Sequence, residues 1–146
     1  MKPFYLDTSA IVKVYVRESG STEVLKLLQD ARPVVCCELG YVEVRAALAA
    51  AMRAQRLRES QHATALAQFR SDWVNYSTIS TDTLLIARAA ELAEGFGLRG
   101  YDSLHVASAE RARIAFPAIQ FLSFDQAMNR AAKLLGFAIP ALSLIP

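Results

Sequence analysis

The sequence predicts an α/β fold in which a parallel β-sheet is covered by helices on both faces. Short apolar runs alternate along the chain with longer segments of helical spacing, as in α/β proteins. Residues 34–37 are apolar throughout, which is typical of a strand buried on both faces. The chain has 146 residues, 53% of them apolar, a size at which one domain with one core is usual. We therefore expect a single domain over residues 1–146.

The first half of the chain is expected to contain two strands and four helices. Residues 4–6 are an apolar run too short for a helix, and the three polar residues after them can cap a following helix. Apolar residues at helical spacing predict a helix over 21–31, which Pro33 ends. After the strand at 34–37 come an alanine-rich helix over about 41–56 and a further helix over 60–73.

The second half repeats this alternation. Weak alternation of apolar and polar residues predicts a third strand over 74–78. A helix over 82–94 has polar cap residues before it, and two glycines, Gly95 and Gly97, follow it. The remaining expected elements are a helix over about 102–113, a fourth strand over 119–124, a helix over 126–135 and a fifth strand over 138–144.

Composition excludes several classes of protein. A net charge of only +2 with this apolar content does not fit a disordered chain. The longest stretch without a charge, residues 134–146, is shorter than the ~18 apolar residues of a membrane-spanning helix. Asp7 interrupts the N-terminal apolar run, so no signal peptide is expected and the protein should stay in the cytoplasm. Cys36 and Cys37 are the only cysteines and are expected to be buried thiols in a strand.

Four of the fourteen acidic residues are hard to explain as solvated side chains. Asp7 and Asp125 directly follow the first and fourth strands, whereas Glu43 and Asp102 lie near the starts of largely apolar helices. In a parallel sheet these positions share one edge, where α/β proteins bind ligands. Two carboxylates about 4 Å apart repel by roughly 4 kcal/mol at an effective dielectric constant of 20, so a cluster of them requires a cation. Carboxylate oxygens favour Mg²⁺ or Mn²⁺ over zinc.

Each of these acids also has an alternative structural role. Asp7 and Asp125 are suited to cap helices, and Asp102 to complement a helix dipole. Glu43 is placed to pair with Arg45 two residues later or to close a capping interaction. Taken one at a time, the residues leave the metal site and these structural roles equally open.

Four motifs carry a resemblance to a known family. They are Leu6-Asp7-Thr8-Ser9-Ala10 with Lys13, Tyr41-Val42-Glu43-Val44-Arg45-Ala46-Ala47-Leu48, Tyr101-Asp102-Ser103-Leu104-His105-Val106-Ala107-Ser108-Ala109, and Leu122-Ser123-Phe124-Asp125. In order and spacing, over about residues 3–140, the chain closely resembles the PIN-domain ribonucleases. More narrowly, it resembles the short single-domain PIN toxins of bacterial and archaeal type II toxin–antitoxin modules.

The resemblance implies a three-layer α/β/α sandwich with a mostly parallel sheet of about five strands. It implies that the metal-site and catalytic acids, which bind one or two Mg²⁺ or Mn²⁺ ions, are Asp7, Glu43, Asp102 and Asp125, and that Thr8 and Ser9 are polar pocket residues. It further implies an endoribonuclease that cleaves RNA phosphodiester bonds with a metal-activated water and is controlled by a small antitoxin protein. Within the acid set, we expect Asp7 and Asp102 to bind the metal most directly.

Other features leave alternatives open. Arg45, Arg53, Arg56 and Arg58 span a stretch without an acid, which suits either an RNA path or a solvated helix face. His105 follows Asp102 by three residues, and packing between helices is a commoner role for such a histidine than metal ligation. Apolar residues in 21–28 and 60–69 suit a homodimer or an antitoxin helix, although core packing explains most of the pattern.

Three rival functions fit the sequence less well than the nuclease. A phosphatase of the haloacid dehalogenase type needs a second aspartate two residues after the first, where this chain has Ser9. A receiver-type phosphoacceptor needs an acidic pair after the first strand, which is also missing from the sequence. The alternative from another class is a catalytically silent PIN-like module that binds RNA or protein, and the intact set of four acids argues against it.

Overall fold

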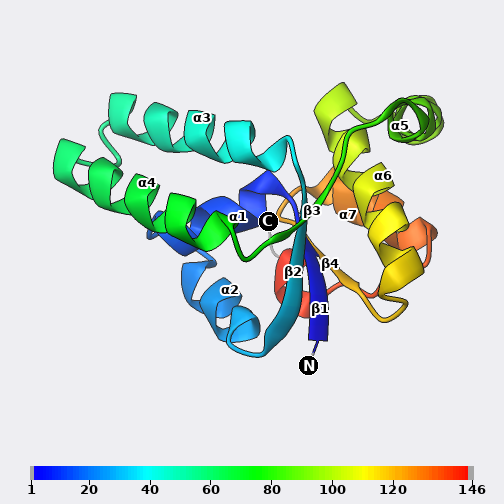
Figure 1. The fold of residues 1–146 in the computed structure, drawn as a ribbon, viewed down its shortest axis with the longest axis horizontal. Helices are drawn as coiled ribbons and strands as arrows, with labels where there is room; N and C mark the ends of the chain where they lie inside the picture. Colours follow the sequence, from blue (N-terminus) through cyan, green and yellow to red (C-terminus); the bar gives the residue numbers. More distant parts are fainter. Residues whose placement is uncertain (1, 145–146) are drawn as a thin grey trace.

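A parallel sheet forms the centre of the computed structural model, which describes residues 2–144 (Figure 1). In this part of the chain the sheet has four strands in the order β3-β2-β1-β4, and every neighbouring pair is parallel. The strands are β1 (Lys2–Leu6), β2 (Ala31–Cys37), β3 (Ser77–Ile79) and β4 (Gln120–Leu122). β1 lies between β2 and β4, so the first strand pairs with the last one.

Helices cover both faces of the sheet, as expected for parallel strands. Successive side chains of a strand point to opposite faces, and β1 shows this: Phe4 and Leu6 belong to one core, and Tyr5 to the other. The first core is covered by α1 (Thr8–Tyr15), α2 (Ser21–Leu28), α3 (Gly40–Arg53) and α4 (Glu59–Trp73). The second is covered by α5 (Thr83–Phe96), α6 (Gly100–Ala115) and α7 (Gln126–Leu134). The predicted three-layer α/β/α arrangement is confirmed.

The predicted fifth strand over 138–144 is wrong. Residue Ala138 makes a single bridge with Gln120 of β4, and its carbonyl accepts the Phe121 N–H at 3.0 Å. Pro140 follows, which has no N–H to extend the pairing, and the chain turns into the short 3₁₀ helix η1 (Ala141–Leu144). The alanine-rich helix is also shorter than predicted, because Gln55 adopts a left-handed backbone conformation (φ 60°) after α3 has ended.

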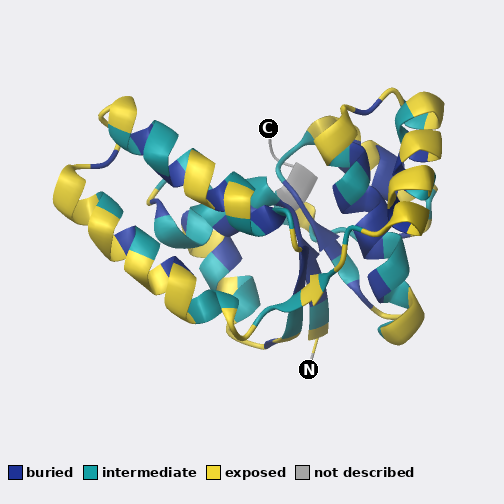
Figure 2. Cartoon of the chain, turned by 45° about the horizontal axis from the view of Figure 1, so that its top comes forward, coloured by how far each residue is buried: buried dark blue, intermediate teal, exposed yellow. Residues whose placement is uncertain are grey.

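Helices α3 and α4 form an arm, residues 40–73, that extends away from the sheet (Figures 1 and 2). Phe69 of α4 is fully buried at its base. Its ring lies 5.4 Å from Tyr15, 5.5 Å from Tyr41 and 5.5 Å from Trp73, measured between ring centroids. This aromatic cluster therefore joins the arm to α1, and the outward faces of the arm are exposed (Figure 2).

Gly40, the first residue of α3, packs directly on β2. A Cβ atom added at this glycine would collide with the Sγ atom of Cys36. Cys36 itself is fully buried and, as predicted, both cysteines are free buried thiols. The absence of a side chain at Gly40 thus sets how closely α3 approaches the sheet.

We expect Gly40→Ala to destabilise the protein by about 1–3 kcal/mol through overpacking against Cys36. In a Cys36→Ala background the same substitution should cost clearly less, because the sulfur atom is gone. Urea denaturation of the four proteins of this double-mutant cycle measures the difference. An equal cost in both backgrounds would contradict the proposed contact.

The helices of the described residues 2–144 include none that is long and apolar enough to cross a membrane.

Candidate functional site

Asp7 lies at the carboxyl end of β1 and is the N-cap of α1, so the capping role considered for it is confirmed. Its carboxylate is only 1% exposed and is held by three neutral donors. Oδ1 accepts the Ser9 hydroxyl at 2.7 Å and the Ala10 N–H at 3.1 Å, and Oδ2 accepts the Ser123 hydroxyl at 2.8 Å. Burial raises the pKa of Asp7, although the nearby His105 and these hydrogen bonds oppose the increase.

Glu43 projects from the first turn of α3 towards α1 and α6. Its Oε1 atom accepts the Thr8 hydroxyl at 2.9 Å and lies 2.7 Å from His105 Nε2. Burial raises the pKa of Glu43, but the hydrogen bond and charge of His105, together with Thr8, outweigh it, so the net shift is downward. The alternative pairing with Arg45 is wrong, because Arg45 instead contacts Tyr41 through its hydroxyl at 3.3 Å and its ring.

Asp102 and Asp125 share a cationic neighbour, Arg99. The Arg99 Nε atom donates to Asp102 Oδ2 at 2.9 Å, and its Nη2 atom lies 3.7 Å from Asp125 Oδ2. Asp125 also caps α7, since its Oδ1 accepts the Met128 N–H at 2.9 Å. The Arg99 side chain is 82% exposed, so water screens its attraction to both acids.

These contacts join all four predicted acids at one edge of the sheet. The Asp125 N–H donates to the Ser123 hydroxyl at 3.0 Å, and that hydroxyl donates to Asp7. Arg99 then connects Asp125 to Asp102 on α6. On α6, one turn after Asp102, His105 contacts Glu43, and Glu43 accepts the hydroxyl of Thr8, the residue after Asp7.

The chemistry of this donor set fits a divalent cation. Four carboxylates supply hard oxygen ligands, and within residues 2–144 the buried Asp7 forms no ion pair that would offset its charge. Arg99, held between two of the acids, is a cation in the place where positive charge is needed. In the same described part of the chain, however, no three Asp, Glu, His or Cys side chains lie close enough to hold an ion together.

Three residues of the site were not assigned to it from the sequence. Ser123 and His105 are buried and bond directly to acids of the site. Asn129 of α7 is also buried, and its side-chain amide donates to the Ser123 carbonyl at 2.9 Å, which holds the β4–α7 turn. Their positions in the sequence could have indicated them. Ser123 precedes Asp125 by two residues, and His105 and Asn129 follow Asp102 and Asp125, respectively, by about one helical turn.

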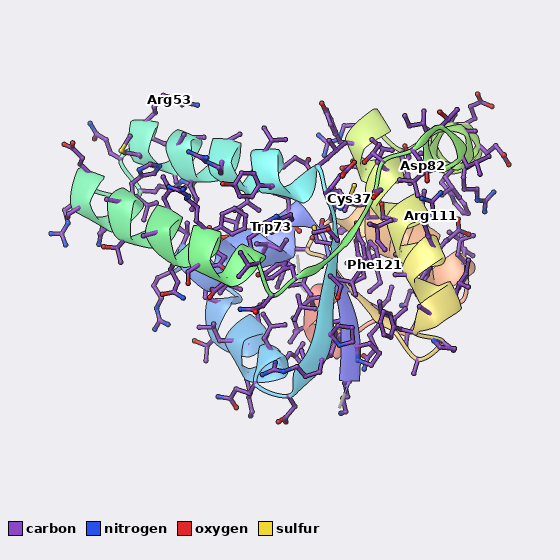
Figure 3. The ribbon with its side chains drawn as sticks, in the orientation of Figure 1. Cys37, Arg53, Trp73, Asp82, Arg111 and Phe121 are labelled. Carbon is purple, nitrogen blue, oxygen red and sulfur yellow. The ribbon has the colours of Figure 1, made fainter. Side chains whose placement is uncertain are left out.

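The arginine stretch is not gathered at the acids. Arg45 lies within one turn of Glu43, but Arg53 is at the far end of α3 (Figure 3), about 15 Å along the helix at 1.5 Å per residue. Arg56 lies beyond α3 and contacts Glu18 of the α1–α2 connection at 3.5 Å. The structure thus places most of this stretch along and beyond α3.

The apolar segments considered for a partner are mainly packed inward. Val24 of α2 and Ala65 and Phe69 of α4 are buried in the core. The core-packing interpretation of these segments is therefore confirmed. Large apolar side chains are instead exposed elsewhere, among them Val42 and Ile86.

Comparison with known proteins gives three kinds of match. The family model described as PIN domain matches residues 4–134. Ribonuclease VapC45 and Ribonuclease VapC46 of Mycobacterium tuberculosis are each 32% identical to this chain, over 97% of it and over 97% and 98% of their own lengths. Among solved structures, FitAB bound to the IR36 DNA fragment has a TM-score of 0.69 at 16% identity, and covers 98% of this chain and 97% of its own. VapBC2 from Rickettsia felis, bound to a promoter DNA fragment, has a TM-score of 0.61 at 14% identity, with 94% and 97% covered.

Proposed function

Because the chain belongs to the PIN domain family, we propose that it is a metal-dependent endoribonuclease that cleaves RNA phosphodiester bonds by activating a water molecule. The observation that carries this proposal is that four carboxylates, from four separate segments, lie along one edge of the sheet and are linked through Ser123, Arg99 and His105. Relatives named as ribonucleases support it, since they are 32% identical over nearly the whole chain. The cation is Mg²⁺ or Mn²⁺, the ions that carboxylate ligands favour.

In this proposal the four acids have different roles. Asp7 and Asp102 hold the cation most directly, and Glu43 and Asp125 complete its shell or position the attacking water. When bound, the cation lowers the pKa of a coordinated water and neutralises charge on the leaving oxygen. Ser123 and the cap of α1 keep the Asp7 carboxylate in one orientation before any ligand arrives, so little reorganisation is needed.

We further propose that this single domain, residues 1–146, is the toxin of a type II toxin–antitoxin pair in the cytoplasm. The FitAB and VapBC2 structures, which this fold resembles, support a small protein partner. The homodimer expected from the sequence stays a prediction. The exposed side chains of Val42, Ile86 and Tyr101 suit it better than the inward-packed segments 21–28 and 60–69.

Purified protein should cleave RNA in the presence of Mg²⁺ or Mn²⁺ and stop when EDTA removes the ion. Gel analysis of cleavage products over time measures this, with Asp7→Ala as the control that excludes a contaminating nuclease. Binding of RNA without cleavage under every metal condition would instead support the catalytically silent module.

A separate experiment tests whether RNA binds along the α3–α4 arm. Replacing Arg53, Arg56 and Arg58 with Ala, in an Asp7→Ala background that cannot cleave, should weaken RNA binding. It should also reduce the slope of log K against log salt concentration by about two, at ~0.7 per single-strand phosphate contact. The matched control removes three exposed cations on other helices, Lys26 of α2 and Arg130 and Lys133 of α7. If the arm variant kept the slope of log K against log salt concentration, these arginines would not contact the RNA.

A further inference from the structure

His105 lies inside the protein and contacts three polar side chains from distant parts of the sequence, Tyr5, Glu43 and, at 3.4 Å from Nε2, the Thr8 hydroxyl. It is 3% exposed on α6. Its Nδ1 atom lies 2.8 Å from the hydroxyl of Tyr5, on β1, and its Nε2 atom lies 2.7 Å from Glu43 Oε1. The imidazole therefore bridges the core of the sheet and the acidic edge.

The partners of the ring determine which nitrogen carries the proton. A carboxylate can only accept hydrogen bonds, so His105 Nε2 must donate to Glu43. In the neutral imidazole Nδ1 is then an acceptor, and it receives the hydroxyl proton of Tyr5. The Tyr5 oxygen in turn accepts the Cys37 N–H at 3.1 Å, so all the bonds run in one direction, from Cys37 to Glu43.

Packing holds the rings of Tyr5 and His105 in place. The Tyr5 ring is stacked on Phe121 at 5.7 Å between centroids and meets His105 edge-on at 6.0 Å. Tyr5 and Phe121 are both fully buried. Because the interior is close-packed, the imidazole cannot turn away from Glu43 unless one of these rings moves.

We propose that Tyr5 and His105 are positioning residues, which hold the Glu43 carboxylate in the one orientation that serves the cation. This inference rests on the proposed nuclease function. Oε1 of Glu43 receives both the His105 and the Thr8 bonds, and within residues 2–144 no side chain bonds to Oε2. Oε2 is therefore the oxygen left for the cation or its water. Partners of this kind, which orient a ligand, typically contribute 10–100-fold in metal affinity or activity.

Two substitutions of His105 separate positioning from packing. His105→Gln carries an amide that reaches Glu43, whereas His105→Asn is long enough for Tyr5 but too short for Glu43. We expect kcat/KM for RNA cleavage to fall about 10–100-fold in the Asn variant and to stay within about threefold of wild type in the Gln variant. Val106→Ala is the control for lost packing, because Val106 is equally buried on α6 but has no polar group.

Two measurements without turnover complete the test. In ¹⁵N NMR spectra of the metal-free protein at pH 8, His105 should be protonated at Nε2 and unprotonated at Nδ1, and Tyr5→Phe should relax this preference. In a Mn²⁺ titration followed by electron paramagnetic resonance, His105→Asn should bind Mn²⁺ at least about tenfold more weakly than the wild type and Val106→Ala.

The outcomes distinguish this inference from the proposed function. A proton on Nδ1, or Asn and Gln variants with the same activity and Mn²⁺ affinity, would overturn the positioning role. A wild-type protein that binds Mn²⁺ but cleaves no RNA would overturn the nuclease function, while the NMR spectra and the Mn²⁺ titration would still decide the role of His105.

Discussion

Asp7→Asn is expected to reduce metal-dependent RNA cleavage by about 10³-fold and at the same time to make the metal-free protein more stable. The amide has the shape of the carboxylate but no charge with which to hold a cation. In the wild type the Asp7 carboxylate is buried and forms no ion pair among the described residues. Burial disfavours its charged form, and the pKa of Asp7 is therefore raised. Removing such a charge should stabilise the fold at neutral pH, although the Asn amide nitrogen cannot accept the hydrogen bond that one Asp7 oxygen accepts, which reduces the gain.

The pH dependence of this stability gain follows from the sign of the shift. Because the pKa of Asp7 is higher in the folded than in the unfolded protein, its contribution to stability is present at low pH and lost as the pH rises through the folded value. The difference between the variant and the wild type should therefore be small in acid and full at neutral pH. Urea denaturation in EDTA across this range, alongside cleavage assays in Mg²⁺, measures both effects. Full cleavage by Asp7→Asn would show that the assignment of this acid is wrong.

Asp82 provides a matched control for Asp7. It too caps a helix, since its Oδ1 accepts the Leu85 N–H at 2.9 Å, but it is exposed and bonded to Arg111 at 2.7 Å (Figure 3). The Arg111 bond lowers the pKa of Asp82 to about 2. Its contribution is thus present above the unfolded pKa and lost only as the pH falls towards 2. Asp82→Asn should weaken the fold at neutral pH, the opposite sign to Asp7→Asn, and should leave cleavage unchanged.

Phe69→Ala is expected to have the largest effect on stability, about 3–5 kcal/mol. The side chain is fully buried and contacts three aromatic rings, from α1, α3 and α4 itself. Its removal leaves a cavity where the α3–α4 arm meets the body of the protein. The free energy of unfolding in urea measures the loss, with the 78%-exposed Leu84 changed to Ala as a surface control expected to stay within about 0.5 kcal/mol. A loss below about 1 kcal/mol would mean that the arm is held by other contacts.

The strand-end acids were predictable because a parallel sheet brings the carboxyl ends of its strands to one edge. Asp7 directly follows β1 and Asp125 follows the end of β4 by three residues, and both ends meet because β1 pairs with β4. The apolar residues of 138–144 could not show that the fifth strand predicted there is wrong, because its pairing with β4 stops after a single bridge, near Pro140. The same apolar pattern suits a strand and an irregular packed segment equally well.

The bonds of His105 were hidden from the sequence for a different reason. Glu43 and His105 are 62 residues apart, and Tyr5 and His105 are 100 apart. Helical spacing indicates that His105 faces inward, but not what it meets there. α3 and α6 belong to the cores on opposite faces of the sheet, so only the complete fold brings these two side chains together, and no periodicity within either helix encodes their contact.

The pairing of β1 with β4 has a consequence for the timing of synthesis. Ser123 and Asp7, which bond to each other, are separated by 116 residues, so the acidic edge cannot be assembled until the last strand has left the ribosome. A nascent or truncated chain that ends before β4 lacks Ser123, Asp125 and the neighbour that β1 needs on one side. The acidic edge of this fold is therefore completed late in synthesis, once β4 and the residues that follow it can pair with β1.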